Sequence, residues 1–288
     1  MKKKKDDFWG NLGLGANFGA NLGAGFNPFG QASQDPKNPK ITGAGNLPGG
    51  TYESVTITGA GKVDGNVKAK SIVLAGAATI AGDVNTDTFQ AQGSCTVTGR
   101  VVAEDFSSAG ATKIARGVKA DTVKTGGAFS AGDDVEADSF RASGALTIDG
   151  ALKAKEVDIE LAGRSSVQRI KARTISVRRG SSSSGASANV SVGGVTATSA
   201  HGASASAFAC GGSAGAVACG ASGGSSTEGV LEADSIEGDT VTLEATRART
   251  VKGKRVRVGA GCEIERVTYS ESLDVDEHAR VKTREQSR

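Results

Sequence analysis

The chain has 288 residues, of which 42 are glycine and only 4% are aromatic, and its net charge is +3. So few large side chains exclude a thick globular core. The near balance of charge argues against a duplex nucleic-acid partner, because proteins that bind nucleic acid usually carry a clear basic excess.

The first fifty residues have no sustained period and are rich in Gly and Asn, so residues 1–50 are predicted to be a disordered tail. Basic residues are attracted to anionic lipid, and aromatic side chains favour the membrane interface. The tail therefore opens with a candidate membrane contact formed by Lys2, Lys3, Lys4, Lys5, Phe8 and Trp9. The alternative is a tail that keeps assemblies soluble or makes lateral contacts through its Phe-Gly pairs.

No apolar segment typical of a signal peptide follows the lysines. The most apolar stretch, SIVLAGAATIAG, is too short and too rich in glycine to span a membrane. We therefore expect a cytoplasmic protein with reduced thiols, located at the inner face of the cell membrane if its tail binds lipid.

A repeat of seventeen residues begins at Gly59. Glycine occupies the same position in six successive units: Gly59, Gly76, Gly93, Gly110, Gly127 and Gly144. Apolar residues recur four, eight and thirteen residues after each glycine, and short β-branched pieces are bounded by turn-forming residues. This spacing does not fit an amphipathic helix. It predicts an all-β parallel solenoid in which each column forms an interior ladder and each glycine allows a corner with positive φ.

A left-handed hexapeptide helix is the alternative solenoid, but it needs an aliphatic residue at every sixth position, and these columns do not have that spacing. The first part of the solenoid is predicted over residues 51–180, and the coil after Glu160 carries about one extra residue. A Ser/Gly/Ala-rich insertion follows over residues 181–229. Alternating apolar pairs then resume, which predicts C-terminal coils over 230–282 and a charged tail over 283–288, giving roughly ten or eleven coils, about 50 Å long.

The seventeen-residue columns and the closing segment VGAGCEIERVTYSESLDVD resemble the bactofilins, bacterial polymer-forming cytoskeletal proteins. The resemblance implies a right-handed parallel β-helix with disordered tails. It also implies assembly without nucleotide into non-polar filaments, often at membranes, that act as a scaffold for cell shape, division or motility. The implied partners are further copies of the chain, anionic membrane, and cell-envelope or motility proteins. The long tails and the insertion depart from the family pattern.

Residues that could carry chemistry do not form a recognisable constellation, so we expect neither an enzyme nor a bound cofactor or metal. His201 lies in the insertion and His278 in a charged segment, and both are predicted to be solvated. Cys210 and Cys219 have a spacing that no common zinc site uses. Cys95 and Cys262 are expected to fill small spaces beside the coils.

One charged column, formed by Asp87, Glu104, Asp121 and Asp138, could suggest calcium binding. Lys70 and Lys155 occupy the same position in flanking coils, so the column is predicted to be a solvated outer corner.

The predicted function is a filament-forming scaffold, because an open solenoid end presents unpaired backbone groups and a slice of apolar core. The candidate polymerisation interface consists of Leu273, Val275 and Val281 near the C-terminal end. The alternatives are a solenoid that does not polymerise and serves as a binding module, either surface- or spore-associated, and, less favoured, a solenoid enzyme.

Overall fold

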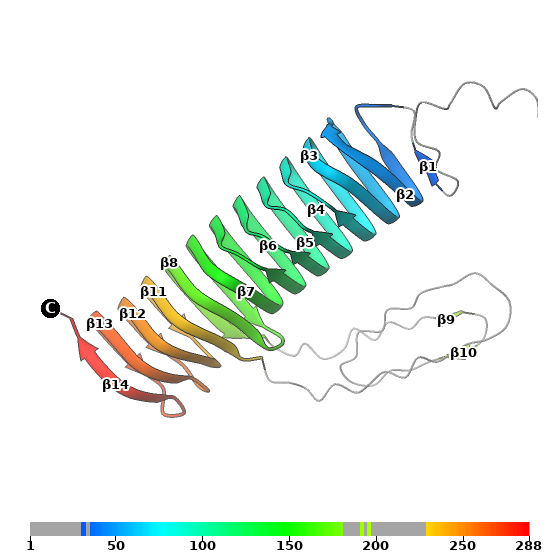
Figure 1. Cartoon of the computed structure of the whole chain (residues 1–288). Coiled ribbons are helices and arrows are strands. Elements are labelled where there is room, and N and C mark those ends of the chain that lie inside the picture. The colour runs from blue at the N-terminus through cyan, green and yellow to red at the C-terminus, as the bar shows by residue number, and fades with distance from the viewer. Residues whose placement is uncertain (1–29, 33–34, 181–190, 193–194, 197–228, 288) are drawn as a thin grey trace, which may run out of the picture.

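The computed structural model describes residues 30–32, 35–180, 191–192, 195–196 and 229–287. In these residues the chain forms strands and no helix, and one sheet winds into a parallel β-solenoid of about 12 turns with roughly 17 residues per turn (Figure 1). The predicted fold class is confirmed. The sheet contains β1 (Gly30–Ala32), β2 (Lys40–Thr51), β3 (Ser54–Ile80), β4 (Val84–Val97), β5 (Val101–Ile114), β6 (Val118–Ala131), β7 (Val135–Leu161), β8 (Ser165–Arg179), β11 (Leu231–Leu243), β12 (Thr246–Val258), β13 (Glu263–Val275) and β14 (Arg280–Gln286).

The core is a set of inward columns in which each residue lies on its equivalent in the preceding coil. From β4 to β7 the pairing is parallel and in register, so that Val84, Val101, Val118 and Val135 form one continuous ladder. A neighbouring column stacks the rings of Phe89 and Phe106 with centroids 5.1 Å apart. A single coil cannot bury this face alone, so the stability of each coil depends on its two neighbours.

The glycine column forms a corner of every coil from β3 to β7, and all six predicted glycines have positive φ. Gly110 shows why the position is restricted. Its φ is +114°, and an added Cβ would lie 2.4 Å from the carbonyl oxygen of Gly93 in the preceding coil. The corner therefore needs glycine both for its backbone conformation and for the close approach of adjacent coils.

The register changes between β7 and β8, where the alignment shifts between Ile148 and Ala151. The insertion follows β8, and among its described residues β9 (Ser191–Val192) pairs antiparallel with β10 (Val195–Thr196). After the insertion, β11 pairs in parallel with β8, so the ladder continues from Val177 to Leu243. Figure 1 shows the two parts of the solenoid stacked on one another at this point.

The structure corrects the predicted boundaries at both ends. Residues 40–50, predicted as tail, belong to β2, because Ile41 and Leu47 extend inward columns and are buried. At the other end, β14 runs to Gln286 instead of stopping at residue 282. Together these two extensions lengthen the solenoid by about one turn.

Candidate functional site

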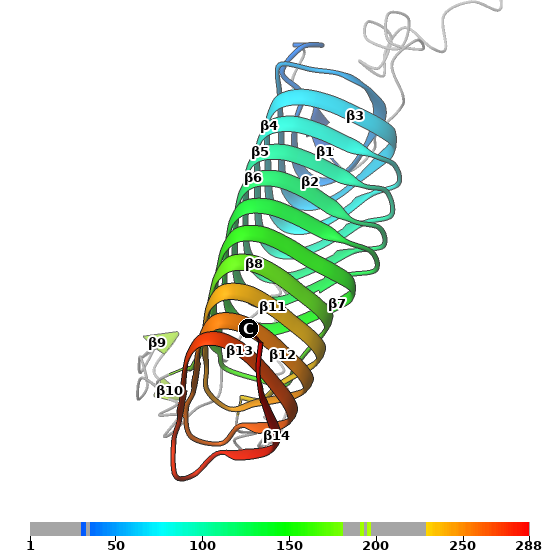
Figure 2. The ribbon, with the colours of Figure 1, turned by 90° about the vertical axis from the view of Figure 1, so that its left-hand side faces the viewer.

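The C-terminal end of the solenoid carries the three residues predicted as an interface. Leu273 and Val275 lie in β13, and Val281 lies in β14. Figure 2 shows that β13 and β14 form this end of the solenoid. All three are only partly buried and pack against the core. Each lies directly beyond a buried residue of the preceding coil: Val256, Val258 and Ile264, respectively. The end of the solenoid therefore exposes the final members of three inward columns.

A charged residue ends a fourth column, which the sequence analysis missed. Arg284 in β14 pairs with Val267 and is exposed. In the preceding coils this column is apolar throughout: Val67, Val84, Val101, Val118, Val135, Leu152, Ile170, Ile236, Val251 and Val267. A further step of seventeen residues from Val267 leads to Arg284 and would have identified it. A charge at a strand edge opposes unspecific pairing with other chains.

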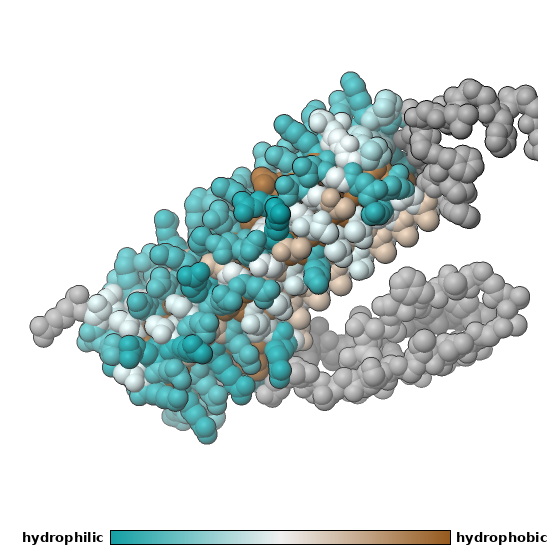
Figure 3. Space-filling model, viewed as in Figure 1, coloured by the Kyte–Doolittle hydropathy of each residue, from teal (hydrophilic) through white to brown (hydrophobic). Residues whose placement is uncertain are grey.

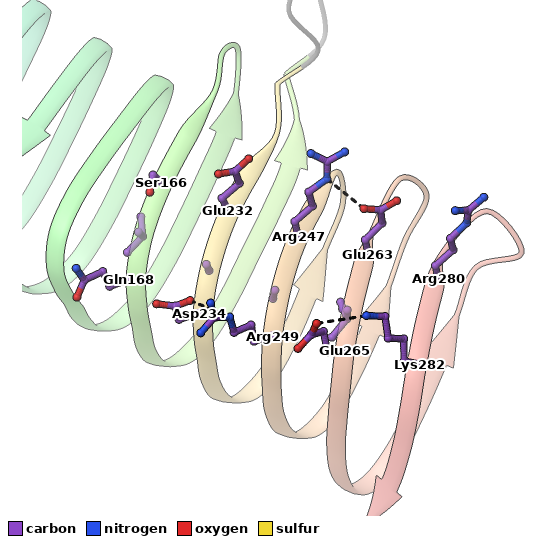
Figure 4. Close-up of a pocket in the computed structure, with 14 residues that line it drawn as sticks. Ser166, Gln168, Glu232, Asp234, Arg247, Arg249, Glu263, Glu265, Arg280 and Lys282 are labelled. Carbon is purple, nitrogen blue, oxygen red and sulfur yellow. Dashed lines mark hydrogen bonds and ion pairs between the residues drawn. The ribbon is translucent and has the colours of Figure 1, made fainter.

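A groove of about 560 Å³ crosses the outer face of β8, β11, β12, β13 and β14 (Figure 4). Its walls are two rows of outward side chains, and the buried Ala248 lies between the rows. The charged members of both rows change sign from one coil to the next: Glu232, Arg247, Glu263 and Arg280 in one row, and Asp234, Arg249, Glu265 and Lys282 in the other.

Ion pairs between adjacent coils explain this alternation. Arg247 Nε lies 3.2 Å from Glu263 Oε2, and Lys282 Nζ lies 3.3 Å from Glu265 Oε1. Like charges placed directly opposite each other on neighbouring strands are destabilising, so successive coils favour opposite signs. Figure 3 shows that the visible face of these C-terminal coils is mostly hydrophilic. The charges in the groove are therefore paired between coils, and each such exposed pair contributes at most about 1 kcal/mol.

Contacts between adjacent coils also shift the pKa of an acidic side chain, Asp134. The Asp134 carboxylate accepts a hydrogen bond from the backbone N–H of Ala151 at 2.8 Å and one from Lys153 Nζ at 3.1 Å. These two contacts, in that order, lower the pKa of Asp134. Burial raises the pKa of Cys95 to about 12, which leaves its thiol protonated and unreactive at neutral pH.

The other candidate residues lie where the sequence indicated, as far as the structure describes them. Cys95 and Cys262 are buried, and the side chain of His278 is 81% exposed. The acidic column is solvated, and Asp138 forms an ion pair with Lys155 at 2.7 Å. The remaining candidates lie outside the described residues: Lys2, Lys3, Lys4, Lys5, Phe8, Trp9, His201, Cys210 and Cys219.

Within the described ranges, no three His, Cys, Asp or Glu side chains come together as potential metal ligands. The same ranges contain no helix with the length and apolar character needed to cross a membrane.

Comparisons with known proteins give short matches. The chain is 46% identical over 54 residues to a protein described as uncharacterized protein YhbE of Bacillus subtilis (strain 168), a match that covers 19% of the chain and 23% of the relative. It is also 46% identical over 52 residues to uncharacterized protein YhbF of the same organism, covering 18% of the chain and 22% of the relative. The chain thus spans less than a quarter of each relative. No family model and no solved structure matches it significantly.

Proposed function

We propose that this protein is a structural scaffold whose solenoids assemble end to end into filaments, without nucleotide and without enzymatic activity. The observation that carries the proposal is the C-terminal end, where Leu273, Val275 and Val281 end inward columns and remain partly exposed. A second solenoid placed on this end would cover these side chains and pair the open strand edge. Edges of this kind favour association with another chain.

Assembly through like ends makes each joint isologous, and a filament with such joints has no polarity. This arrangement agrees with the bactofilin resemblance of the sequence. In a cell, such filaments would serve as a cytoplasmic scaffold for shape, division or motility, and they would recruit cell-envelope or motility proteins.

The substitution Leu273→Arg tests the scaffold proposal. A charge at the end of an inward column would be desolvated in a joint, so we expect filaments to be lost while the remaining coils stay folded. The matched control is Ser94→Arg, which adds the same charge at an exposed position of β4, away from both ends of the solenoid. Electron microscopy and sedimentation measure assembly, and circular dichroism measures folding. Wild-type protein that stays monomeric at tens of micromolar, at every salt concentration and pH tried, would contradict the proposal.

Membrane association through the N-terminal basic and aromatic residues is part of the same proposal. A single tail with four lysines binds anionic lipid weakly, but a filament presents many tails and gains avidity. We expect replacement of Lys2, Lys3, Lys4 and Lys5 by serine to reduce co-sedimentation with anionic liposomes at least about tenfold, since each lysine near the surface contributes about 1 kcal/mol. Substitution is preferable to truncation because β1 begins at Gly30. Equal binding by both proteins, or equal binding to neutral liposomes, would remove the membrane role.

A further inference from the structure

The C-terminal end of the solenoid is stepped, because β14 covers only half of the last coil. Its 7 residues pair with β13 from Glu263 to Tyr269. From Ser270 to Val275, β13 has no outer neighbour among the described residues. Two strand edges are therefore open at different levels, the outer edge of β14 and the outer edge of the second half of β13.

Charge divides these two edges. The outer edge of β14 carries Arg280, Lys282 and Arg284, and its one carboxylate, Glu285, pairs with Arg266 of the preceding coil at 3.7 Å. We name this predominantly positive edge the basic edge. The edge of β13 from Ser270 to Val275 carries Glu271 and Asp274, and we name it the acidic edge. These side chains are solvent-accessible, since Lys282 is 75% exposed and Asp274 is 73% exposed.

On their inner side, both edges already follow the alternation of charge between coils. Arg255 and Arg257 of β12 lie 3.6 Å from Glu271 and 3.4 Å from Asp274, respectively. Lys282 of the basic edge lies 3.3 Å from Glu265. A further strand that pairs with these open edges would continue the alternation only if it placed acidic side chains beside the basic edge and basic side chains beside the acidic edge.

We propose that a second copy of the chain provides this layer through its own C-terminal end, related by a two-fold axis perpendicular to the solenoid. In this joint, the β14 strand of each copy occupies the vacant half-coil of the other. The basic edge of each copy then lies beside the acidic edge of its partner, and the contact occurs twice. The inference rests on the proposed self-assembly and adds to it the identity, orientation and charge of the joint.

Shape and burial support a joint between like ends. The two-fold axis reverses the strand direction, so the edges would pair antiparallel and satisfy both open rows of backbone groups. Leu273, Val275 and Val281 would be covered in the same step. Arg284 would find carboxylates of the partner nearby, whereas a purely apolar partner would leave its charge unpaired.

The N-terminal end does not offer the same surface. There, β1 pairs antiparallel with β2 at residues 41–43. Ile41 and Leu47 are already buried, at 2% and 8% exposure. The strand β2 carries a single charged residue, Lys40. A C-terminal end would therefore meet neither exposed core residues nor matching carboxylates on β2.

Charge reversal on one edge at a time tests this joint. The variant Glu271→Lys/Asp274→Lys has two basic edges, and the variant Arg280→Glu/Lys282→Glu has two acidic edges. Each variant alone would place like charges together at both contacts, so we expect its association to weaken at least tenfold. An equimolar mixture brings opposite charges together at both contacts, so association should recover. Sedimentation velocity at about 0.05 M and 0.5 M salt measures this, with the recovery lost at high salt because ions screen exposed charges.

Controls separate folding from assembly. The reversals also remove ion pairs within the chain, so thermal unfolding of each variant is followed by circular dichroism. Two variants that remove a charge without reversing it, Asp274→Asn and Lys282→Gln, should each weaken association less than the charge reversals do. Variants that associate as tightly as wild type, or a mixture of folded variants that does not recover, would overturn the joint while leaving the scaffold proposal intact. A monomeric wild type would overturn both.

Discussion

We expect Gly127→Ala to lower the free energy of unfolding by about 3 kcal/mol, since strained backbone conformations cost about 1–3 kcal/mol each and a steric contact is added here. Gly127 has a φ of +93°, and an added Cβ would lie 2.5 Å from the carbonyl oxygen of Gly110. To avoid this contact, the coils that contain Gly110 and Gly127 must move apart, and their separation would weaken the packing of the interior columns between them. Urea denaturation followed by circular dichroism measures the change.

The neighbouring Gly126 provides a matched control. An added Cβ at Gly126 would lie 3.8 Å from the carbonyl oxygen of Ser108, which is an ordinary van der Waals contact. The φ of Gly126 is outside the positive range, so Gly126→Ala should change stability by less than about 1 kcal/mol. Equal destabilisation by the two substitutions would show that the corner geometry does not restrict position 127.

We expect Phe106→Ala to reduce the free energy of unfolding by about 3–5 kcal/mol, the cost of removing a large buried aromatic side chain. Phe106 is 1% exposed, and its ring stacks on Phe89 at 5.1 Å and meets the edge of Phe129 at 5.9 Å. The cavity would lie in the middle of the solenoid, where coils on both sides restrict collapse. The same denaturation measurement applies.

The control for Phe106→Ala lies on the same strand, β5. Val102 is 36% exposed, so Val102→Ala should change stability by less than about 0.5 kcal/mol. A small effect of Phe106→Ala, similar to that of Val102→Ala, would mean that the aromatic stack contributes little to holding coils together.

The repeat is visible in the sequence because every coil has the same corner in its backbone and the same set of inward-facing positions. Gly110 and Gly127 need the same corner, and Val101 and Val118 face the same interior, so the residue types recur at a constant spacing. Such a repeat can be recognised from the spacing of residue types along the sequence, without knowing how the coils stack. The candidate interface residues Leu273, Val275 and Val281 followed from the same columns, although their role in assembly is still a prediction.

The ends of the solenoid could not be placed in the same way. Residues 40–50 were predicted as tail because their pattern is weak, yet pairing with β3 makes them a coil. Similarly, residues 283–286, including Arg284, are predicted as part of a charged tail, yet they belong to β14, which pairs with half of β13. Whether a terminal segment forms a strand depends on the edge that it meets.

The sequence by itself determined the all-β class, the seventeen-residue coil and the glycine corner, because these are periodic and arise from local backbone and side-chain preferences. Only the tertiary structure decided where the solenoid begins, where β14 stops, and which charges lie together at the C-terminal step. Those features depend on pairing between segments that no repeat relates, and their free energy comes from contacts with a neighbouring coil instead of from the segment itself.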